Sequence, residues 1–282
     1  MGALSHLRVL DLSRVLAGPW SGKILADLGA EVIKVERPGS GDDTLAGGPP
    51  FLKDAYGENT SEAAYYLSAN RNKESVTIDF TRPEGQKLVR DLAAKSDILI
   101  ENFKVGGLAA YGLDYESLKE INPELIYCSI TGFGQTGPYA GRAGYDFMIQ
   151  GLGGLMSLTG RPEGDEGAGP VKVGVALTDI LTGLYSTVAI LAALAHRDHD
   201  GGGQHIDMAL LDVQVPCIER NAMGSVKAIN AVRMALRGDG QHVVAGEGHH
   251  ARAQLKVQRM QWSFQQGFGG HIQLLKNVRT RC

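Results

Sequence analysis

The sequence predicts an α/β protein in which an open, mostly parallel sheet carries flanking helices. Short apolar runs alternate with helical segments through the first hundred residues. Helices of this length between strands imply parallel pairing through right-handed crossovers. The 282 residues, 43% of them apolar and 21% charged, suffice for one large domain or two smaller ones.

The strands and helices follow one another in a regular order. LRVLDLS is the first strand, and Pro19 begins a helix that runs to about Leu28, because proline suits the first helical turn. The next segments are strands at EVIKVER and SVTIDF, a helix from Gln86 to Lys95, and strands at DILIENF and LIYCSITGFG. Ligands of such sheets bind beyond the carboxyl ends of the strands. The residues that follow each strand are therefore the first candidates for a site.

A carboxylate at an apolar junction is the most informative single residue. Val173, Val175 and Leu177 alternate with small residues and predict a short buried strand. From Ile180 the apolar positions are so continuous that the helix is expected to be buried on most of its circumference. Asp179 lies between the two. It either caps the helix, as Thr178 also could, or is kept ionised by the helix N-terminus as a poised nucleophile.

Composition and charge exclude several classes of protein. The net charge of -3 and the isoelectric point near 6.2 give no signature of nucleic-acid or membrane binding. Three cysteines, Cys128, Cys217 and Cys282, share no CxxC spacing, so neither a zinc site nor a disulfide framework is indicated. No targeting signal and no run of about 18 uninterrupted apolar residues is present. A reducing cytoplasm is the expected location.

Polar residues follow several of the predicted strands. The turn from Ser13 to Pro19 lacks GxGxxG spacing, which argues against a nicotinamide-dependent oxidoreductase. Arg37 supplies a planar fork for a phosphate or an adenine face, and Asn102 with Phe103 offers an amide and a ring. Turn chemistry with solvated charges explains any one of them. Their convergence, with further donors at residues 70–73, favours a long, anionic, adenine-bearing ligand.

Seven motifs in order resemble class III CoA-transferases of the CaiB/BaiF type. They are VLDLSRVLAGPW, LGAEVIKVERPGSGD, YYLSANRNKESVTID, ILIENFKVG, INPELIYCSITGFGQTGPYAGRAGYD, GLMSLTG and GVALTDILTGLYSTVAILAAL. The resemblance covers about residues 4–213. The wording GDDTLAGGPPF, YYLSANRNK and YCSITGFGQTGP is most similar to the succinyl-CoA:glutarate (dicarboxylate) branch.

The resemblance implies that Asp179 is the nucleophile, forming a mixed anhydride and then an aspartyl-CoA thioester. It implies acyl-CoA and small carboxylic acids as substrates, with no permanently bound cofactor and no metal. Relatives form interlocked homodimers, so the resemblance implies a homodimer for the full-length family. The positions that the resemblance places at or near the coenzyme A site are Val15, Leu16, Ala17, Arg37, Asn70, Arg71, Lys73, Asn102, Phe103, Lys104, Arg142 and Asp146.

The sequence changes character near residue 214. Residues 1–213 carry 18 Lys and Arg against 28 Asp and Glu, whereas residues 214–282 carry 10 against 3. We expect residues 1–213 to form the large-domain portion, with the small domain absent. The basic tail carries no family motif and is explained best by a frame-shifted or truncated reading of a transferase gene. We expect low or no transferase activity of the isolated 282-residue chain.

Two functions follow from this interpretation. The first is CoA transfer through Asp179, and the alternative is a catalytically impaired remnant that binds CoA. Metal binding by His249 and His250, or nucleic-acid binding by the tail, is disfavoured because no ligand spacing or recognition motif accompanies them.

Overall fold

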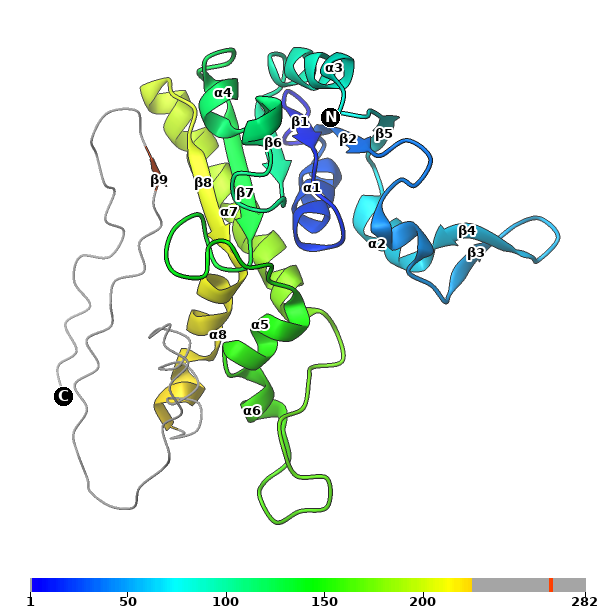
Figure 1. Cartoon of the computed structure of the whole chain (residues 1–282), viewed down its shortest axis with the longest axis vertical. Coiled ribbons are helices and arrows are strands. Elements are labelled where there is room, and N and C mark those ends of the chain that lie inside the picture. Colours follow the sequence, from blue (N-terminus) through cyan, green and yellow to red (C-terminus); the bar gives the residue numbers. More distant parts are fainter. Residues whose placement is uncertain (1, 225–263, 266–282) are drawn as a thin grey trace.

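A seven-stranded sheet forms the centre of the computed structural model, which describes residues 2–224 and 264–265 (Figure 1). Its strands are β1 (Arg8–Asp11), β2 (Glu31–Glu36), β5 (Glu74–Thr77), β6 (Ile98–Glu101), β7 (Ile126–Thr131), β8 (His205–Ala209) and β9 (Phe264–Gln265). They lie in the order β5-β2-β1-β6-β7-β8-β9. All neighbours from β5 to β8 are parallel, and β9 pairs antiparallel with β8. The predicted open, mostly parallel α/β sheet is confirmed.

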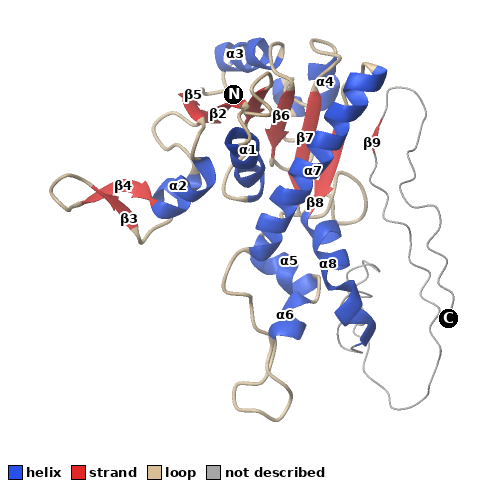
Figure 2. Ribbon diagram, turned by 180° about the vertical axis from the view of Figure 1, so that it is seen from behind, coloured by secondary structure: helices blue, strands red, loops and turns tan. Residues whose placement is uncertain are grey.

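Helices cover both faces of this sheet. α1 (Ala17–Asp27), α7 (Leu177–Asp200) and α8 (Leu210–Gly224) pack on one face, where α7 runs along the strands (Figure 2). α3 (Pro83–Ala93) and α4 (Tyr115–Lys119) pack on the other. Side chains of each strand alternate between the two cores, so Val9 contacts the α1 side and Leu10 the α3 side.

Shorter elements extend from this frame. They are η1 (Asp43–Ala46), β3 (Phe51–Lys53), β4 (Asn59–Ala63), α2 (Ala64–Asn70), η2 (Ala109–Tyr111), α5 (Asp146–Leu152) and α6 (Leu155–Thr159). β3 and β4 form an antiparallel hairpin that stands away from the main sheet in both views (Figures 1 and 2). The hairpin was not predicted, because its residues show little apolar alternation.

Two expectations for α7 are wrong. The segment directly before it is not a strand: Val175 is 54% exposed in an irregular segment, and the helix already begins at Leu177. Its outer face is also uncovered by the described residues, since Leu184, Tyr185, Val188 and Leu191 are between 37% and 64% exposed. By length and composition alone, Leu177–His199 could cross a membrane, yet half of an apolar 18-residue window within it is buried in the protein.

The expected division at residue 213 falls within α8. The division into a large-domain portion and a tail stays a prediction, because residues 225–263 and 266–282 lie outside the described residues. His249, His250 and Cys282 belong to that part of the chain.

Two buried ion pairs lie at the carboxyl ends of β1 and β2. Lys73 Nζ contacts Asp11 Oδ2 at 2.8 Å, and Lys34 Nζ contacts Asp42 Oδ2 at 2.8 Å, with all four side chains at most 1% exposed. Burial alone would raise the pKa of Asp11, but the ammonium groups of Lys73 and Lys34 hold it below its ordinary value. The two pairs therefore hold the segment between α2 and β5, and the loop after β2, against the strand ends.

Removing Lys73 from its ion pair with Asp11 tests this arrangement. Lys73→Met leaves Asp11 buried without its nearest cation, so the free energy of unfolding should fall by about 3–5 kcal/mol. Lys87→Met, which removes an exposed partner of Asp91, should change it by less than about 1 kcal/mol. Chemical denaturation measures both. Equal losses in the two variants would contradict a structural role for the buried pair.

Candidate active site

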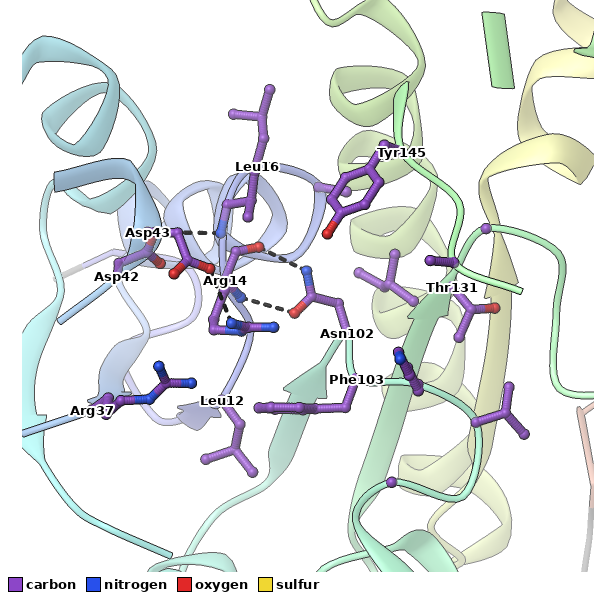
Figure 3. Close-up of a pocket in the computed structure, with 18 of the residues that line it drawn as sticks. Leu12, Arg14, Leu16, Arg37, Asp42, Asp43, Asn102, Phe103, Thr131 and Tyr145 are labelled. Atoms are coloured by element: carbon purple, nitrogen blue, oxygen red, sulfur yellow. Dashed lines mark hydrogen bonds and ion pairs between the residues drawn. The ribbon is translucent and has the colours of Figure 1, made fainter. Parts of the chain in front are cut away.

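A cleft with a volume of about 540 Å³ opens at the carboxyl ends of β1, β2, β6 and β7 (Figure 3). Its walls come from the turn after β1, the loop after β2, the segment after β6, and the loop between β7 and α5. Asp179 of α7 also lines it. The carboxyl edge of the sheet, where the sequence places a ligand, thus carries a cleft.

The turn from β1 into α1 forms one wall. The side chain of Asn102, which follows the neighbouring β6, holds this turn from both sides: Oδ1 accepts from the Arg14 amide at 2.9 Å, and Nδ2 donates to the Arg14 carbonyl at 2.7 Å (Figure 3). Val15 then adopts a left-handed conformation with φ of 69°. Leu16 and Ala17, which follow it, line the cleft at the beginning of α1.

Exposed cations and aromatic rings form the outer part of the cleft. Arg37, Lys104 and Arg142 all line it and are exposed. The ring of Phe103 packs edge-to-face on Phe80, with centroids 5.7 Å apart. This combination of guanidinium, ammonium and ring suits a ligand with phosphates and an aromatic base.

A close contact between α1 and α7 brings Asp179 to the cleft. A Cβ added at Gly183 would lie 2.8 Å from the Ala17 carbonyl oxygen and 2.9 Å from Trp20 Cβ, so only glycine permits this approach. Asp179 precedes Gly183 by four residues and therefore projects from the same face of α7. Its carboxylate consequently lies beside the first turn of α1.

Asp146, at the beginning of α5, supports the N-terminus of α7. Its Oδ1 accepts from the Thr178 amide at 2.8 Å and the Asp179 amide at 3.3 Å, and its Oδ2 accepts from Gln150 Nε2 at 2.6 Å. The residue before α7, Ala176, makes no side-chain cap. The reading of Asp179 or Thr178 as the cap is therefore wrong, because a carboxylate from another helix satisfies those amides.

The helix terminus does not keep Asp179 fully ionised, because a carboxyl group with a pKa of about 7 is about half ionised at pH 7. Burial first, and then the nearby Asp146 carboxylate, raise the pKa of Asp179 to about 7. Among the residues that the structure describes, no cation compensates it in the way that Lys73 compensates Asp11. A carboxyl group with such a pKa in a cleft is a candidate for chemistry rather than for structure.

Most predicted site residues meet in the cleft, and a few do not. Its lining includes Val15, Leu16, Ala17, Arg37, Asn102, Phe103, Lys104, Arg142 and Asp179. The cleft lining does not include Asn70, Arg71, Lys73 or Asp146. Arg71 pairs with Asp27 on the surface, and Asn70 Oδ1 accepts from buried Lys73 at 2.9 Å. Residues 70–73 therefore support the strand ends and do not face the cleft, because their polar groups already bond to other groups of the protein.

Sequence reasoning missed several residues around the cleft. Glu101 accepts from the Phe103 amide at 2.7 Å and so orients the start of that loop. Burial, with Asp179 and Asp146 nearby, raises the pKa of Tyr65 to about 12, so its phenol stays protonated close to the nucleophile candidate. The YY pair in YYLSANRNK was the available signal for Tyr65, but a single sequence gives no reason to choose between packing and function.

Comparison with known proteins decides the family. The model of CoA-transferase family III matches residues 4–254. The chain belongs to CoA-transferase family III. It is similar to a succinate–glutarate CoA-transferase of Agrobacterium fabrum, at 63% identity over 75% of this chain and 52% of that protein. The human succinyl-CoA:glutarate CoA-transferase is 50% identical over 78% of this chain and 48% of that protein.

A solved structure shares the fold of this family III chain. A CAIB/BAIF family protein from Brucella suis matches 79% of this chain and 57% of that chain, with a TM-score of 0.74 and 59% identity. The resemblance inferred from the seven motifs is confirmed. The chain spans about half the length of the curated relatives that it matches.

The raised pKa of Asp179 predicts a pH-dependent effect on stability. Because the pKa in the folded state, about 7, exceeds the ordinary 3.8, the fold binds a proton that the unfolded chain releases, and stability falls as pH rises from 4 to 7. Asp179→Asn should therefore raise the free energy of unfolding by about 1–3 kcal/mol at pH 8 and by little at pH 4. Asp165→Asn, an exposed loop control, should show no such trend. A gain independent of pH, measured by denaturation, would contradict the raised pKa.

Proposed function

We propose that this chain transfers CoA from a donor acyl-CoA to an acceptor dicarboxylate through an aspartyl-CoA thioester on Asp179. Succinyl-CoA and glutarate are the favoured pair, because two relatives at 63% and 50% identity carry these names. One observation carries the proposal. A carboxylate whose pKa is raised to about 7 lies in the wall of a cleft whose outer part carries three exposed cations.

The first half of the reaction acylates the protein. A carboxylate oxygen of Asp179 attacks the thioester carbonyl of the donor, and the C–S bond breaks to give a mixed anhydride and CoA thiolate. The thiolate then attacks the Asp179 acyl carbon of the anhydride. The anhydride C–O bond breaks, the donor acid leaves as its carboxylate, and Asp179 carries CoA as a thioester.

The second half reverses these steps with the acceptor. Its carboxylate attacks the aspartyl thioester, giving a new anhydride and CoA thiolate. Attack of the thiolate on the acceptor acyl carbon forms acceptor-CoA and restores the Asp179 carboxylate. No proton or electron is gained overall, and the energy of the thioester is kept throughout.

The surroundings of Asp179 favour its acylation. The free carboxylate is destabilised by burial and by Asp146, whereas the thioester carries no charge there. Acylation therefore relieves an unfavourable interaction. The proposal also requires that water is kept from the intermediate, because water would hydrolyse it.

The outer cleft supplies the binding of CoA in this proposal. Arg37, Lys104 and Arg142 would hold its phosphates, and Phe103 would contact the adenine or the pantetheine arm. A cytoplasmic location, where acyl-CoA is available, is part of the proposal. No permanently bound cofactor and no metal is needed for the chemistry.

We further propose that the chain forms a homodimer through the outer face of α7. Leu184, Tyr185, Val188 and Leu191 form a continuous apolar stripe on one side of that helix. Such stripes mark interfaces. Sedimentation of the purified chain should give a dimer, and Val188→Glu should give the monomer. A wild-type monomer at all concentrations would contradict this part of the proposal.

A second candidate is a CoA-binding remnant without transferase activity. The observation in its favour is that the chain spans about half the length of its curated relatives. The two candidates differ in one product. A remnant retains CoA by binding alone, whereas a transferase leaves CoA covalently on Asp179.

Intact-mass spectrometry of the 282-residue chain after incubation with succinyl-CoA separates them. The mass should rise by one CoA less one water, and hydroxylamine should remove the adduct. Asp179→Asn should abolish it, whereas the surface control Asp165→Asn should retain it. Bound CoA without any covalent adduct would support the remnant and overturn the transferase.

The rate of adduct formation should rise with pH. Only the ionised carboxylate attacks, and its pKa of about 7 places the midpoint of the rise near that pH. Asp146→Asn keeps a hydrogen-bond acceptor but removes the nearby charge, so it should move the midpoint to lower pH. Single-turnover mass spectrometry between pH 5.5 and 8.5, a range of roughly 1.5 units on each side of the midpoint, measures both. An unshifted midpoint in Asp146→Asn would contradict the role of that charge.

A further inference from the structure

The turn after β1 contains a residue in an unusual conformation. Val15 has φ of 69°, a left-handed region that β-branched residues seldom adopt because the Cβ substituents crowd the backbone. Such outliers persist only where neighbouring contacts hold them, and they concentrate at binding sites. Val15 lines the cleft, so the contacts that hold it also shape the cleft wall.

Those contacts come from two neighbouring segments. Asn102 Oδ1 accepts a hydrogen bond from the Arg14 amide at 2.9 Å, and Asn102 Nδ2 donates one to the Arg14 carbonyl oxygen at 2.7 Å. On the other side, Asp42 Oδ1 accepts from the Val15 amide at 3.4 Å. Asp42 is itself fixed by Lys34 at 2.8 Å and by the Thr44 amide at 2.9 Å. Figure 3 shows Asn102 and Asp42 on opposite sides of the turn.

We propose that Asn102 is a positioning residue, which acts on CoA binding through the strained Val15 turn and not as a ligand of CoA. The inference rests on the proposed function, since CoA is the probe. Without Asn102, the left-handed conformation of Val15 loses its main support on the β6 side. The turn then relaxes, and Leu16 and Ala17 no longer present the cleft wall in its binding shape.

A substitution at position 15 distinguishes the two roles. Glycine adopts φ near 69° without strain, so Val15→Gly removes the need for a clamp. We would titrate free CoA into the full-length chain by calorimetry, comparing the wild type, Asn102→Ala, Val15→Gly and the double variant. Asn122→Ala is the matched control, because Asn122 Nδ2 also donates to two carbonyls, of Ala93 at 3.1 Å and Ser96 at 2.8 Å, and Asn122 is not part of the cleft lining.

The expected result is a loss that depends on the background. Asn102→Ala should weaken CoA binding by about tenfold in the wild type, and by less than about threefold when added to Val15→Gly. Asn122→Ala should bind CoA like the wild type. Equal losses in both backgrounds would identify Asn102 as a direct ligand and overturn the proposal, as would no loss in either.

A second measurement does not depend on CoA. In a double-mutant cycle on chemical denaturation, Asn102→Ala should cost less stability in the Val15→Gly background than in the wild type, because the clamp then has no strain to hold. Additive losses would overturn the clamp. If the wild type binds no CoA, the proposed function fails, and this cycle alone decides whether Asn102 holds the turn.

Discussion

The contact between Gly183 of α7 and the first turn of α1 fixes the geometry on which the site depends. Because no side chain separates the helices there, α7 lies close enough for Ser21 and Thr187 to share a hydrogen bond of 3.1 Å further along. The same approach sets Asp179 beside the turn that Asn102 holds. A wider helix spacing would move the carboxylate away from the cleft without changing any residue of the cleft wall.

The carboxylates near this contact differ in the charge of their neighbours. Asp11 and Asp42 are buried, but each has a lysine at 2.8 Å, and both keep a pKa below the ordinary value even though burial opposes it. Asp179 is partly buried beside another carboxylate, and its pKa rises to about 7. The ion pairs with lysine stabilise the strand ends. The ionised form of Asp179, in contrast, is unfavourable, and protonation or reaction of the carboxylate would remove its charge.

The sequence sufficed for β1, β2, β5, β6 and β7, because they are short runs between helices, as in DILIENF and EVIKVER, whereas β8 and β9 were not predicted. The ordered motifs also led to Asp179 as the expected nucleophile. It misled at Val173 to Leu177, where alternation resembles a strand. There the Val173 amide donates to Gln150 Oε1 at 3.0 Å instead of pairing with a strand. The role of Asp146 at the N-terminus of α7 could not be predicted, because 32 residues separate it from Thr178 and only the fold brings them together.

Polar residues near a site were the hardest to assign from sequence, because the same side chain can face a ligand or the protein. Lys73 has the charge expected of a phosphate ligand, yet its three hydrogen bonds go to Asp11, Pro19 and Asn70. Asn102 lines the cleft, yet its amide holds Arg14. In both cases the residue supports the carboxyl edge of the sheet. Spacing along the chain cannot separate these roles, since support and binding need the same residue types at the same strand ends. The strained Val15 shows why such support is needed, because a turn that is unfavourable by itself keeps its shape only while its neighbours hold it.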